Sequence, residues 1–480
     1  MSKTPRKNNY SNTQFIEVNM NKGKLSALLS DYGMIIVLFI LCIVFALTTF
    51  KEQPAEGYGA GQNLAFKVKD QKEVVLVVTK SNADILLKDG FTESLKGSAV
   101  KISIVEAGSP IEAKKALIAL KDKVAKNTLL VCSKQTGNWT FYSAIDHFSA
   151  SEQLIPQIET RSSFLSIGNL SSLPGKTAKT AIIAIGMTMV IITAGIDLSV
   201  GSLVALASVI STLILRDVFG GDGSVPYIIM AFAAGIGLCG LIGMLSGVLT
   251  TAFKIPSFIV TLAIMLIARG WAQNLSANQT IKVGVPDISW LGLGNGGVYT
   301  ILLMVVLYAL AYVVMHKTVL GRQIYAIGGN QEAARLSGVP VNKVLIIVYT
   351  IAGVMAGIAG IVLTSELNSG SGEYGETWEL SVIAAVVVGG TSLMGGQGKI
   401  LGTLIGCAII EVINNGMNLM GIGSNTQKIV LGLVILLAII IDKMKKGEIA
   451  WISNISGKFK SKDKNKENIE CLSKSTVKAS

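Results

Sequence analysis

Long runs of apolar residues are the feature that most limits what this 480-residue chain can fold into. A helix needs roughly 20 apolar residues to cross the hydrocarbon core of a bilayer. Ten such runs can be read, and several are shorter than that length, which leaves room for a broken or re-entrant segment. The runs are Gly33–Phe50, Thr180–Ala194, Leu198–Leu215, Tyr227–Thr250, Ser257–Leu275, Val298–Met315, Val344–Thr364, Leu380–Met394, Ile400–Met420 and Gln427–Ile441.

The composition places the chain among membrane proteins. Charged residues make up 15% of it and hydrophobic residues 50%, whereas soluble domains carry about 25% charged residues. Backbone polar groups in lipid must be satisfied within their own segment, so these runs predict helices. We expect an all-α polytopic membrane protein with about ten transmembrane helices: an uncleaved first helix at residues 33–50, and a membrane domain at residues 162–442.

The basic residues predict the orientation. Lysine and arginine are enriched in cytoplasmic loops and tails. The tail of residues 443–480 holds ten lysines, and the loop Ser365–Glu379 has four acids and no basic residue. Both termini are therefore expected in the cytoplasm and that loop outside. The net charge of +12 then reflects topology and contact with anionic membrane lipid; no motif for nucleic-acid binding accompanies it. The basic residues of the tail at 1–32 are Lys3, Arg6, Lys7, Lys22 and Lys24.

Residues 51–161 have a different pattern and are expected to form a small α/β extracytoplasmic domain inserted after the first helix. Short β-rich runs alternate with segments of helical spacing, which predicts a βαβαβ unit with a mainly parallel sheet. The predicted strands are Glu73–Thr79, Val100–Val105 and Thr128–Cys132, and the predicted helices are Ala83–Leu95 and Ile111–Lys126.

The insert resembles the first lobe of periplasmic sugar-binding proteins in the segments KEVVLVVT, DGFTESLKG and VKISIVEA. Two interpretations follow. The small size of the insert favours a docking or spacer domain without a ligand, and the resemblance favours a ligand-binding domain.

The polar loop Gly321–Lys343 lies between two long apolar runs and has a basic excess, with Glu332 its one acid. Asn330–Ser337 is predicted to be a short helix, because Asn is a favoured N-cap and Gly338 follows as a stop signal. A short helix that joins two membrane spans can transmit movement from a partner; the alternative is an ordinary connector. The candidate coupling residues are Asn330, Glu332, Ala333, Ala334, Arg335, Leu336 and Gly338.

Several separated segments resemble the ribose/galactose-type sugar ABC transporter permeases. The loop and the span after it, GRQIYAIGGNQEAARLSGVPVNKVLIIVYTIAGVMAGIAGIV, resemble the coupling loop of that family. GMTMVIITAGIDLSVGS at Gly186–Ser202 and IPSFIVT at Ile255–Thr261 are similar to family segments, as are SVIAAVVVGGTSLMGGQGKILGTLIG and NNGMNLMGIGSNTQKIVLGLVILLAIIIDKMKK within Ser381–Lys446. The resemblance covers roughly residues 164–446. It implies a bacterial inner (plasma) membrane subunit without an ATPase of its own.

The sequence lacks the motif for ATP hydrolysis. Gly395–Ile400, GGQGKI, is the nearest match to a phosphate-binding loop, but Leu393 stands where that motif has Gly and Ile400 where it has Ser or Thr. We therefore expect no catalytic residue and no cofactor in this chain, with ATP bound by a partner. The expected partners are a cytoplasmic ATP-binding subunit, an extracytoplasmic solute-binding protein and a second copy of the permease.

Neither the cysteines nor the histidines have the spacing of a metal site. The five cysteines are dispersed, and the two histidines are separated from other ligand-type residues. We predict no metal site and no disulfide framework.

Asp197 and Ser199 lie at the junction of the second and third runs, in the segment AGIDLSVGS. An acid there can cap the third helix through the backbone N–H groups of its first turn. Alternatively, the carboxylate faces the translocation pathway. The expected position near the cytoplasmic edge, where charge is tolerated, favours the cap.

Four polar residues of the ninth run recur at helical spacing and form one stripe: Glu411, Asn414, Asn415 and Asn418. Asparagine offers both donors and acceptors to sugar hydroxyls, but it also joins helices within membranes at about 1 kcal/mol per bond. Both interpretations remain open at this stage. The three asparagines match the NNGxNL pattern of the family, and an acid at Glu411 departs from it.

Glycines spaced four apart are predicted to let helices approach closely. Such pairs place small residues on one helix face, which favours close packing within a membrane. The pairs are Gly243/Gly247, Gly353/Gly357 and Gly402/Gly406.

The function expected from these features is that of a permease subunit of a bacterial ABC importer for a monosaccharide of the ribose, galactose or xylose type. Two alternatives remain: the same architecture for a non-sugar solute, and an ion-coupled secondary transporter with Glu411 as its coupling acid. A sensor is disfavoured because ten spans exceed what signalling needs.

Overall fold

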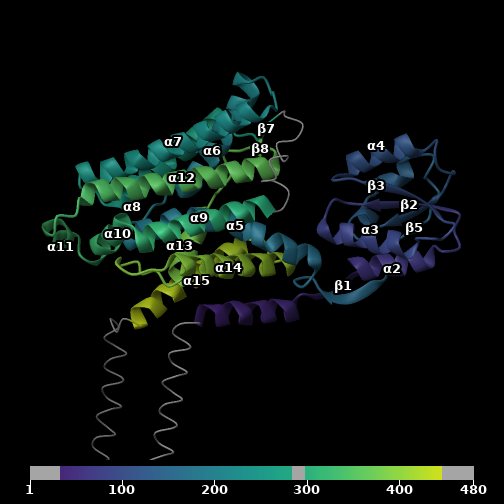
Figure 1. Ribbon diagram of the computed structural model, residues 1–480, viewed down its shortest axis with the longest axis horizontal. Coiled ribbons are helices and arrows are strands. Elements are labelled where there is room, and N and C mark those ends of the chain that lie inside the picture. Colours follow the sequence, from purple (N-terminus) through teal and green to yellow (C-terminus); the bar gives the residue numbers. More distant parts are fainter. Residues whose placement is uncertain (1–32, 284–297, 446–480) are drawn as a thin grey trace, which may run out of the picture.

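The structure is a computed structural model that describes residues 33–283 and 298–445. These residues form a bundle of long helices and a separate α/β domain beside one end of it (Figure 1). The predicted tails at 1–32 and 446–480 lie outside the described residues, and only the first residues of the tail predicted at 443–480 belong to a described helix.

Each of the ten predicted apolar runs overlaps a helix of the described ranges, although the run Leu380–Met394 extends past a helix that ends at Val388. Among the described residues, seven helices are long and apolar enough to cross a membrane, so length and composition there do not confirm the predicted ten spans. The seven are α5 (Ile167–Ile192), α6 (Val200–Leu213, continued by a π-helical turn Ile214–Val218), α7 (Val225–Ala252), α8 (Ser257–Leu275), α9 (Val298–Lys317), α12 (Val341–Leu367) and α14 (Ile400–Leu419). The three shorter apolar helices are Gly33–Thr48, α13 (Trp378–Val388) and the Ser424–Leu437 part of α15 (Ser424–Lys445).

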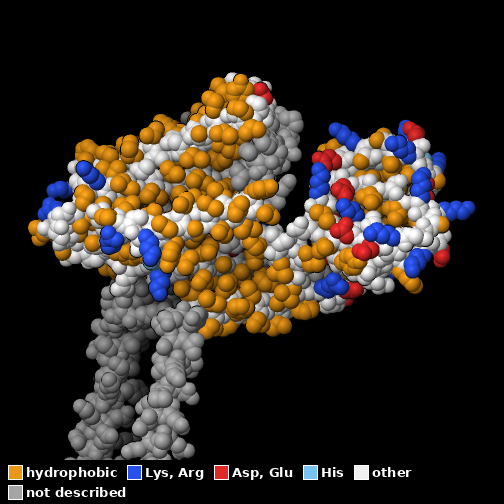
Figure 2. Space-filling model, in the orientation of Figure 1, with side chains coloured by type: hydrophobic (Ala, Val, Ile, Leu, Met, Phe, Trp, Pro, Cys, Tyr) orange, Lys and Arg blue, Asp and Glu red, His pale blue; other side chains and the backbone are white. Residues whose placement is uncertain are grey.

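The bundle surface is largely apolar, as the membrane interpretation requires. Figure 2 shows hydrophobic side chains over most of the bundle face in view, whereas the α/β domain carries mixed Lys, Arg, Asp and Glu side chains. Large apolar patches on a protein surface mark contact with a membrane or another protein. The bundle is therefore suited to lipid and the α/β domain to water.

Glycines allow a close contact between α7 and α12. A Cβ on Gly243 would lie 2.3 Å from the carbonyl oxygen of Tyr349, and one on Gly353 would lie 2.3 Å from that of Cys239. No side chain fits at such distances, so only glycine allows this approach. The predicted packing role of the spaced glycines is confirmed here.

The non-helical segment that links α12 to α13, residues 369–377, packs along α6. It begins at the short strand β8 (Ser369–Gly370), which pairs with β7 (Ile281–Lys282). The backbone N–H of Ser371 donates to Ser208 Oγ in the middle of α6 (3.3 Å), and the Gly375 carbonyl lies against Gly201 near the start of α6. The loop Ser365–Glu379, which the charge pattern predicts on the outer side of the membrane, thus packs into the bundle beside α6.

The insert is built on a parallel sheet in the order β3-β2-β4-β5. The helices α3 and α4 follow the positions predicted from sequence, and α2 adds to them. Apolar clusters cover both faces of the sheet, one containing Leu87 and Phe91 of α3 and the other Leu117 of α4. The elements are α2 (Tyr58–Lys67), β2 (Glu73–Val78), α3 (Asn82–Ser94), β3 (Lys101–Glu106), α4 (Pro110–Leu120), β4 (Leu129–Cys132) and β5 (Gln153–Leu154).

A two-stranded antiparallel ribbon joins the insert to the bundle. Its strands are β1 (Phe50–Pro54), directly after the first helix, and β6 (Ile158–Ser162), directly before α5. Thr49 Oγ1 lies 3.0 Å from Ser162 Oγ at the base of the ribbon. Entry and exit of the insert are thus held together at one point of the bundle.

Candidate functional site

The predicted coupling segment forms two consecutive helices, α10 (Val319–Gly329) and α11 (Gln331–Leu336). The α11 helix matches the short helix predicted at Asn330–Ser337, and the sequence analysis missed α10. Asn330 Oδ1 accepts the backbone N–H of Ala333 at 2.9 Å, which is the N-cap bond that Asn favours. After α11, Gly338 has φ +85° and ends the helix.

The surface of α11 is suited to a protein partner. Leu336 is 84% exposed, whereas Ala334 is 5% exposed and packs against the bundle core. Glu332 and Arg335 form an exposed ion pair of 2.7 Å, three residues apart on the helix. An exposed pair of this kind contributes little to stability. These side chains therefore form a surface that the fold itself does not need.

The other side of this segment is anchored to the bundle. A Cβ on Gly328 of α10 would lie 1.7 Å from the carbonyl oxygen of Ile192, the last residue of α5. Tyr325 Oη donates to the carbonyl of Gly398 at 2.8 Å, and the backbone N–H of Gly396 donates to the Ile192 carbonyl at 2.9 Å. Displacement of α10 would therefore act on α5 and on the loop before α14 together.

Asp197 lies next to this anchor, in the extended turn between α5 and α6. It is fully buried, and its Oδ1 accepts the backbone N–H of Ser199 at 2.8 Å and Ser199 Oγ at 2.6 Å. The predicted bond to the first helical turn is wrong, because the N–H that it accepts belongs to Ser199, the residue before that turn. The second oxygen, Oδ2, is buried without a hydrogen-bond partner in the described residues.

The Asp197 turn is fastened to α8 and lies against α12. Thr261 Oγ1 accepts the backbone N–H of Leu198 at 3.1 Å and donates to the carbonyl of Ile196 at 3.2 Å. A Cβ on Gly195 would lie 2.5 Å from Tyr349 Oη of α12. Four spans, α5, α6, α8 and α12, therefore meet at this turn.

The polar stripe of α14 divides between two environments. Asn415 is buried and its Nδ2 donates to Asn169 Oδ1 of α5 at 2.8 Å, while Lys176 Nζ of α5 donates to Asn415 Oδ1 at 3.3 Å. Asn418 is exposed and accepts from Gln427 Nε2 of α15 at 2.7 Å. These two asparagines join helices. Asn414 and Glu411 have no such bond within the described residues, although the charges of Lys176 and Lys179 act on the Glu411 carboxyl.

Two lysines of α5 complete a charged group that the sequence analysis missed. Lys179 forms an ion pair with Glu366 at the end of α12, and Lys176 lies one helical turn away on the same helix. Both residues precede Thr180, where the apolar run was expected to begin, but α5 begins at Ile167. Ionisable groups within a membrane span mark solute or ion pathways by default. The positive charges near Glu411 and Asn415 therefore mark a polar part of the bundle between α5 and α14.

Arg269 is a second intramembrane charge that the sequence analysis missed. Its Nη1 donates to the carbonyls of Gly372 (2.8 Å) and Tyr374 (2.7 Å). These carbonyls belong to the non-helical segment along α6, where the backbone lacks the hydrogen bonds of a helix. Non-helical backbone at membrane depth requires such substitutes. Arg269 thus holds this segment in place.

A metal site is not evident in the ranges that the structure covers, 33–283 and 298–445: no three His, Cys, Asp or Glu residues are placed to share an ion. Within the same ranges, four cysteines are free thiols: Cys42, Cys132, Cys239 and Cys407.

Comparison with known proteins gives the family. The family model for the permease component of branched-chain amino acid transport systems matches residues 169–439, more than half of the chain. The chain belongs to this permease family. It is 42% identical to the ribose import permease protein RbsC of Escherichia coli K12 over 299 residues, which cover 61% of this chain and 91% of that protein.

Other relatives are sugar permeases as well. The ribose import permease protein RbsC of Bacillus subtilis is 42% identical and covers 59% of this chain and 87% of its own length. The fructose import permease protein FrcC of Rhizobium meliloti is 36% identical, over 61% of this chain and 81% of its own length. No solved structure matches the chain. Within the family, the chain is a sugar-type ABC transporter permease and a multi-pass inner-membrane protein, and ATP-binding and solute-binding partners are general to such importers.

The insert lies outside this similarity, because the family model begins at residue 169. The relatives are matched over most of their own length but over about three fifths of this chain. The bundle therefore carries the family likeness, and the α/β domain is an addition to it.

Proposed function

We propose that this permease moves a monosaccharide of the ribose, galactose or xylose type inward across the membrane, driven by ATP hydrolysis on a partner subunit. The names of the relatives support a sugar substrate. The observation that carries the coupling is the α10–α11 segment, with an exposed surface on one side and tight backbone contacts to α5 on the other.

In this proposal the ATP-binding subunit docks on α11, and Leu336 inserts into it as an apolar anchor between Glu332 and Arg335. Apolar side chains buried at the centre of an interface, with charges at the rim, are the usual arrangement of a docking surface. Movement of the ATP-binding subunit would displace α10. Gly328 would transmit that displacement to the end of α5.

From there the movement reaches four spans. The end of α5 leads directly into the Asp197 turn, which Thr261 ties to α8. Buried, close-packed contacts change between discrete arrangements rather than deform continuously. We therefore propose that the Asp197 turn is a relay between the coupling segment and the spans, with Asp197 and Ser199 holding its shape.

The solute route in this proposal passes the polar part of the bundle. Lys176, Glu411 and Asn414 offer donors and acceptors to sugar hydroxyls, whereas Asn415 and Asn418 hold neighbouring helices. A second copy of the permease would close the other side of the route. The basic tails at both ends of the chain would contact anionic lipid at the cytoplasmic surface.

Uptake into proteoliposomes tests the proposal. The permease is reconstituted with its ATP-binding subunit and its solute-binding protein, and labelled ribose, galactose and xylose are offered with ATP or with an ion gradient alone. Uptake that requires ATP supports the proposal. Uptake with the gradient alone, lost in Glu411→Gln, would instead favour an ion-coupled secondary transporter. ATP-driven uptake of a non-sugar solute only would keep the mechanism and change the substrate.

A further inference from the structure

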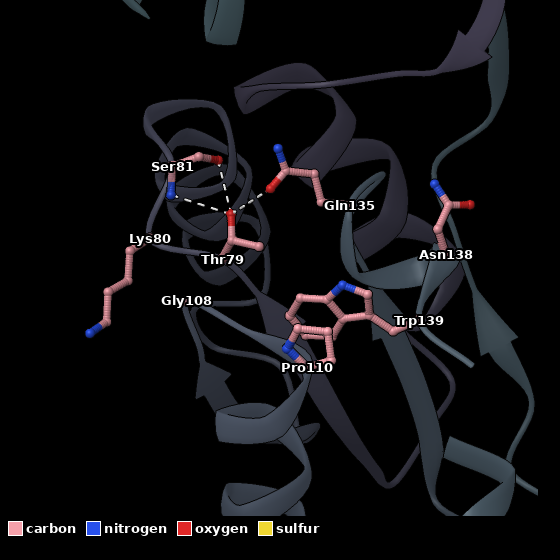
Figure 3. A pocket seen from close by; sticks show the side chains of 8 residues that line it. All are labelled: Thr79, Lys80, Ser81, Gly108, Pro110, Gln135, Asn138 and Trp139. Atoms are coloured by element: carbon pink, nitrogen blue, oxygen red, sulfur yellow. Dashed lines mark hydrogen bonds between the residues drawn. The ribbon is translucent and has the colours of Figure 1, made fainter. Parts of the chain in front are cut away.

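The inserted α/β domain contains a pocket of about 610 Å³, a size typical of small-molecule sites. It opens at the carboxyl end of the parallel sheet, where residues that follow β2, β3 and β4 meet (Figure 3). The side chains that matter for its chemistry are Lys80, Ser81, Pro110, Gln135, Asn138 and Trp139.

The sheet topology places the pocket where open α/β sheets bind ligands. The chain passes from β2 to β3 on one side and then to β4 on the other side of β2. The winding direction therefore reverses beside β2, and the loops after neighbouring strands separate there. A crevice at the carboxyl ends of the strands at such a reversal is the general binding position in this class of sheet.

The wall of the pocket is held by a buried carboxylate. Asp84 is 4% exposed, and its Oδ2 accepts the backbone N–H of Thr79 (2.7 Å), Thr79 Oγ1 (2.7 Å) and Ser133 Oγ (2.7 Å). These bonds join the loop after β2 to the loop after β4. Thr79 Oγ1 also contacts Gln135 Oε1 at 3.1 Å, as Figure 3 shows. Such fixed loops lower the conformational cost of binding a ligand.

The lining groups retain unused hydrogen-bonding capacity. The side-chain amide of Gln135 contacts Thr79 Oγ1 at one end (3.1 Å), and its other end has no hydrogen bond within the described residues. Asn138 uses its Nδ2 on the carbonyl of Lys134 (3.1 Å), which leaves its Oδ1 as an acceptor. Lys80 is exposed and has no ion pair within the described residues, and Trp139 is half-buried and presents an aromatic ring. Donors and acceptors around an aromatic ring suit a ligand with hydroxyl edges and an apolar face.

The same surroundings disfavour an anion. The helices α3 and α4 point their N-termini toward this edge, but each already carries an acid in its first turn, Asp84 and Glu112. Glu112 Oε2 also accepts the backbone N–H of Gly108, in the loop after β3, at 2.8 Å. These carboxylates occupy the positions where a bound anion would gain from the helix dipoles.

We propose that this pocket binds a small neutral polyol of monosaccharide size. The site is separate from the route through the bundle, so it gives the permease a ligand site of its own on the domain that its relatives lack. If the pocket binds no polyol, the proposed transport function is unaffected, because binding is measured without ATP and without partner subunits.

Equilibrium binding to the full chain in lipid nanodiscs, which expose both faces, tests the proposal. Labelled D-ribose, D-galactose and myo-inositol serve as probes. We expect saturable binding of at least one, weakened about tenfold or more by Lys80→Ala and by Trp139→Leu. Trp139→Phe should retain most of the affinity because it keeps an aromatic face. Lys115→Ala, an exposed lysine of α4 away from the pocket lining, is the matched control and should change nothing.

Three results would overturn the proposal. The first is the absence of saturable binding for all three probes. The second is binding that persists unchanged in Lys80→Ala and Trp139→Leu, which would place the site elsewhere. The third is a preference for ribose 5-phosphate over ribose, which would make the pocket an anion site. Lys80 is exposed, so a loss of binding in its variant cannot be attributed to a collapsed domain.

Discussion

Asn415 illustrates how a polar side chain is retained inside an apolar bundle. It is 3% exposed and bonded to Asn169 and Lys176 of α5. Removing it would leave both partners with unmet hydrogen bonds, and an unsatisfied buried polar group costs about 1–3 kcal/mol. Asn414, its neighbour, has no such bond in the described residues. Substitution of Asn415 should therefore affect stability, and substitution of Asn414 should affect transport.

We therefore expect Asn415→Leu to lower the thermal midpoint of the purified permease by several degrees, because Asn169 and Lys176 lose their partner. Asn414→Leu should leave the midpoint within error and reduce sugar uptake. Thermal unfolding in detergent and uptake in proteoliposomes measure the two effects. Equal midpoints for both variants would show that Asn415 does not join the helices.

Helical spacing places the four residues of the stripe on one face but does not reveal their partners. Asn169 lies 246 residues from Asn415 along the chain, and no local pattern links them. Arg269 is a comparable case, because the carbonyls that it binds belong to a loop whose path depends on tertiary packing. A charge inside an otherwise apolar run was the signal available for it.

At the scale of elements, a single proline substitution tests whether α11 couples the permease to its ATP-binding subunit. The backbone N–H of Ala334 donates to the carbonyl of Asn330 at 3.0 Å, so Ala334→Pro removes a helical bond and introduces a ring clash, at about 3 kcal/mol. We expect ATP-driven uptake to be lost while the permease remains inserted, measured by uptake and by co-purification of the ATP-binding subunit.

Gln331→Pro is the matched control. Gln331 is the first residue of α11, a position where proline is well tolerated, and Asn330 before it is already extended, with φ −160° and ψ 109°. Uptake should survive in this variant. Full activity in Ala334→Pro would exclude α11 as the coupling element.

The contact between α7 and α12 gives a second prediction for elements. Gly243→Ala places a Cβ 2.3 Å from the Tyr349 carbonyl, whereas Gly237 of the same helix has nothing within 4 Å. Overpacking of this kind costs about 1–3 kcal/mol, so Gly243→Ala should lower the thermal midpoint and Gly237→Ala should not. Equal stability of the two variants would mean that α7 and α12 separate easily.

The sequence predicted elements well where hydropathy was continuous. Each of the ten apolar runs overlaps a helix. The start of α5 was missed because Pro174, Lys176 and Lys179 interrupt its apolar pattern, and tertiary contacts rather than hydropathy stabilise that half of the helix. The α10 helix was missed because its polar residues resemble a loop, although Ile324 and Ile327 are buried. The course of the segment along α6 depends on contacts that no local pattern encodes.

At the scale of the whole molecule, two ends of the bundle differ in charge. Lys and Arg side chains gather at the end where α10 and α11 lie, and the α/β insert lies beside the opposite end (Figures 1 and 2). Positive charge is enriched on the cytoplasmic side of membrane proteins. If α11 meets the ATP-binding subunit in the cytoplasm, the insert must lie outside, and this orientation is a prediction that labelling can test.

Engineered cysteines at the two ends test the orientation. Gly59 in the insert and Gly329 in α10 each have open space around the position of an added Cβ, so cysteine should be tolerated at both. In intact spheroplasts, a membrane-impermeant maleimide should label Gly59→Cys, and Gly329→Cys should react only after lysis. The native Cys132 should stay silent in both, because burial raises the pKa of its thiol to about 11 and the reactive thiolate is scarce below that pH. Labelling of Gly329→Cys in intact cells, with Gly59→Cys protected, would reverse the orientation and place the insert and its pocket in the cytoplasm.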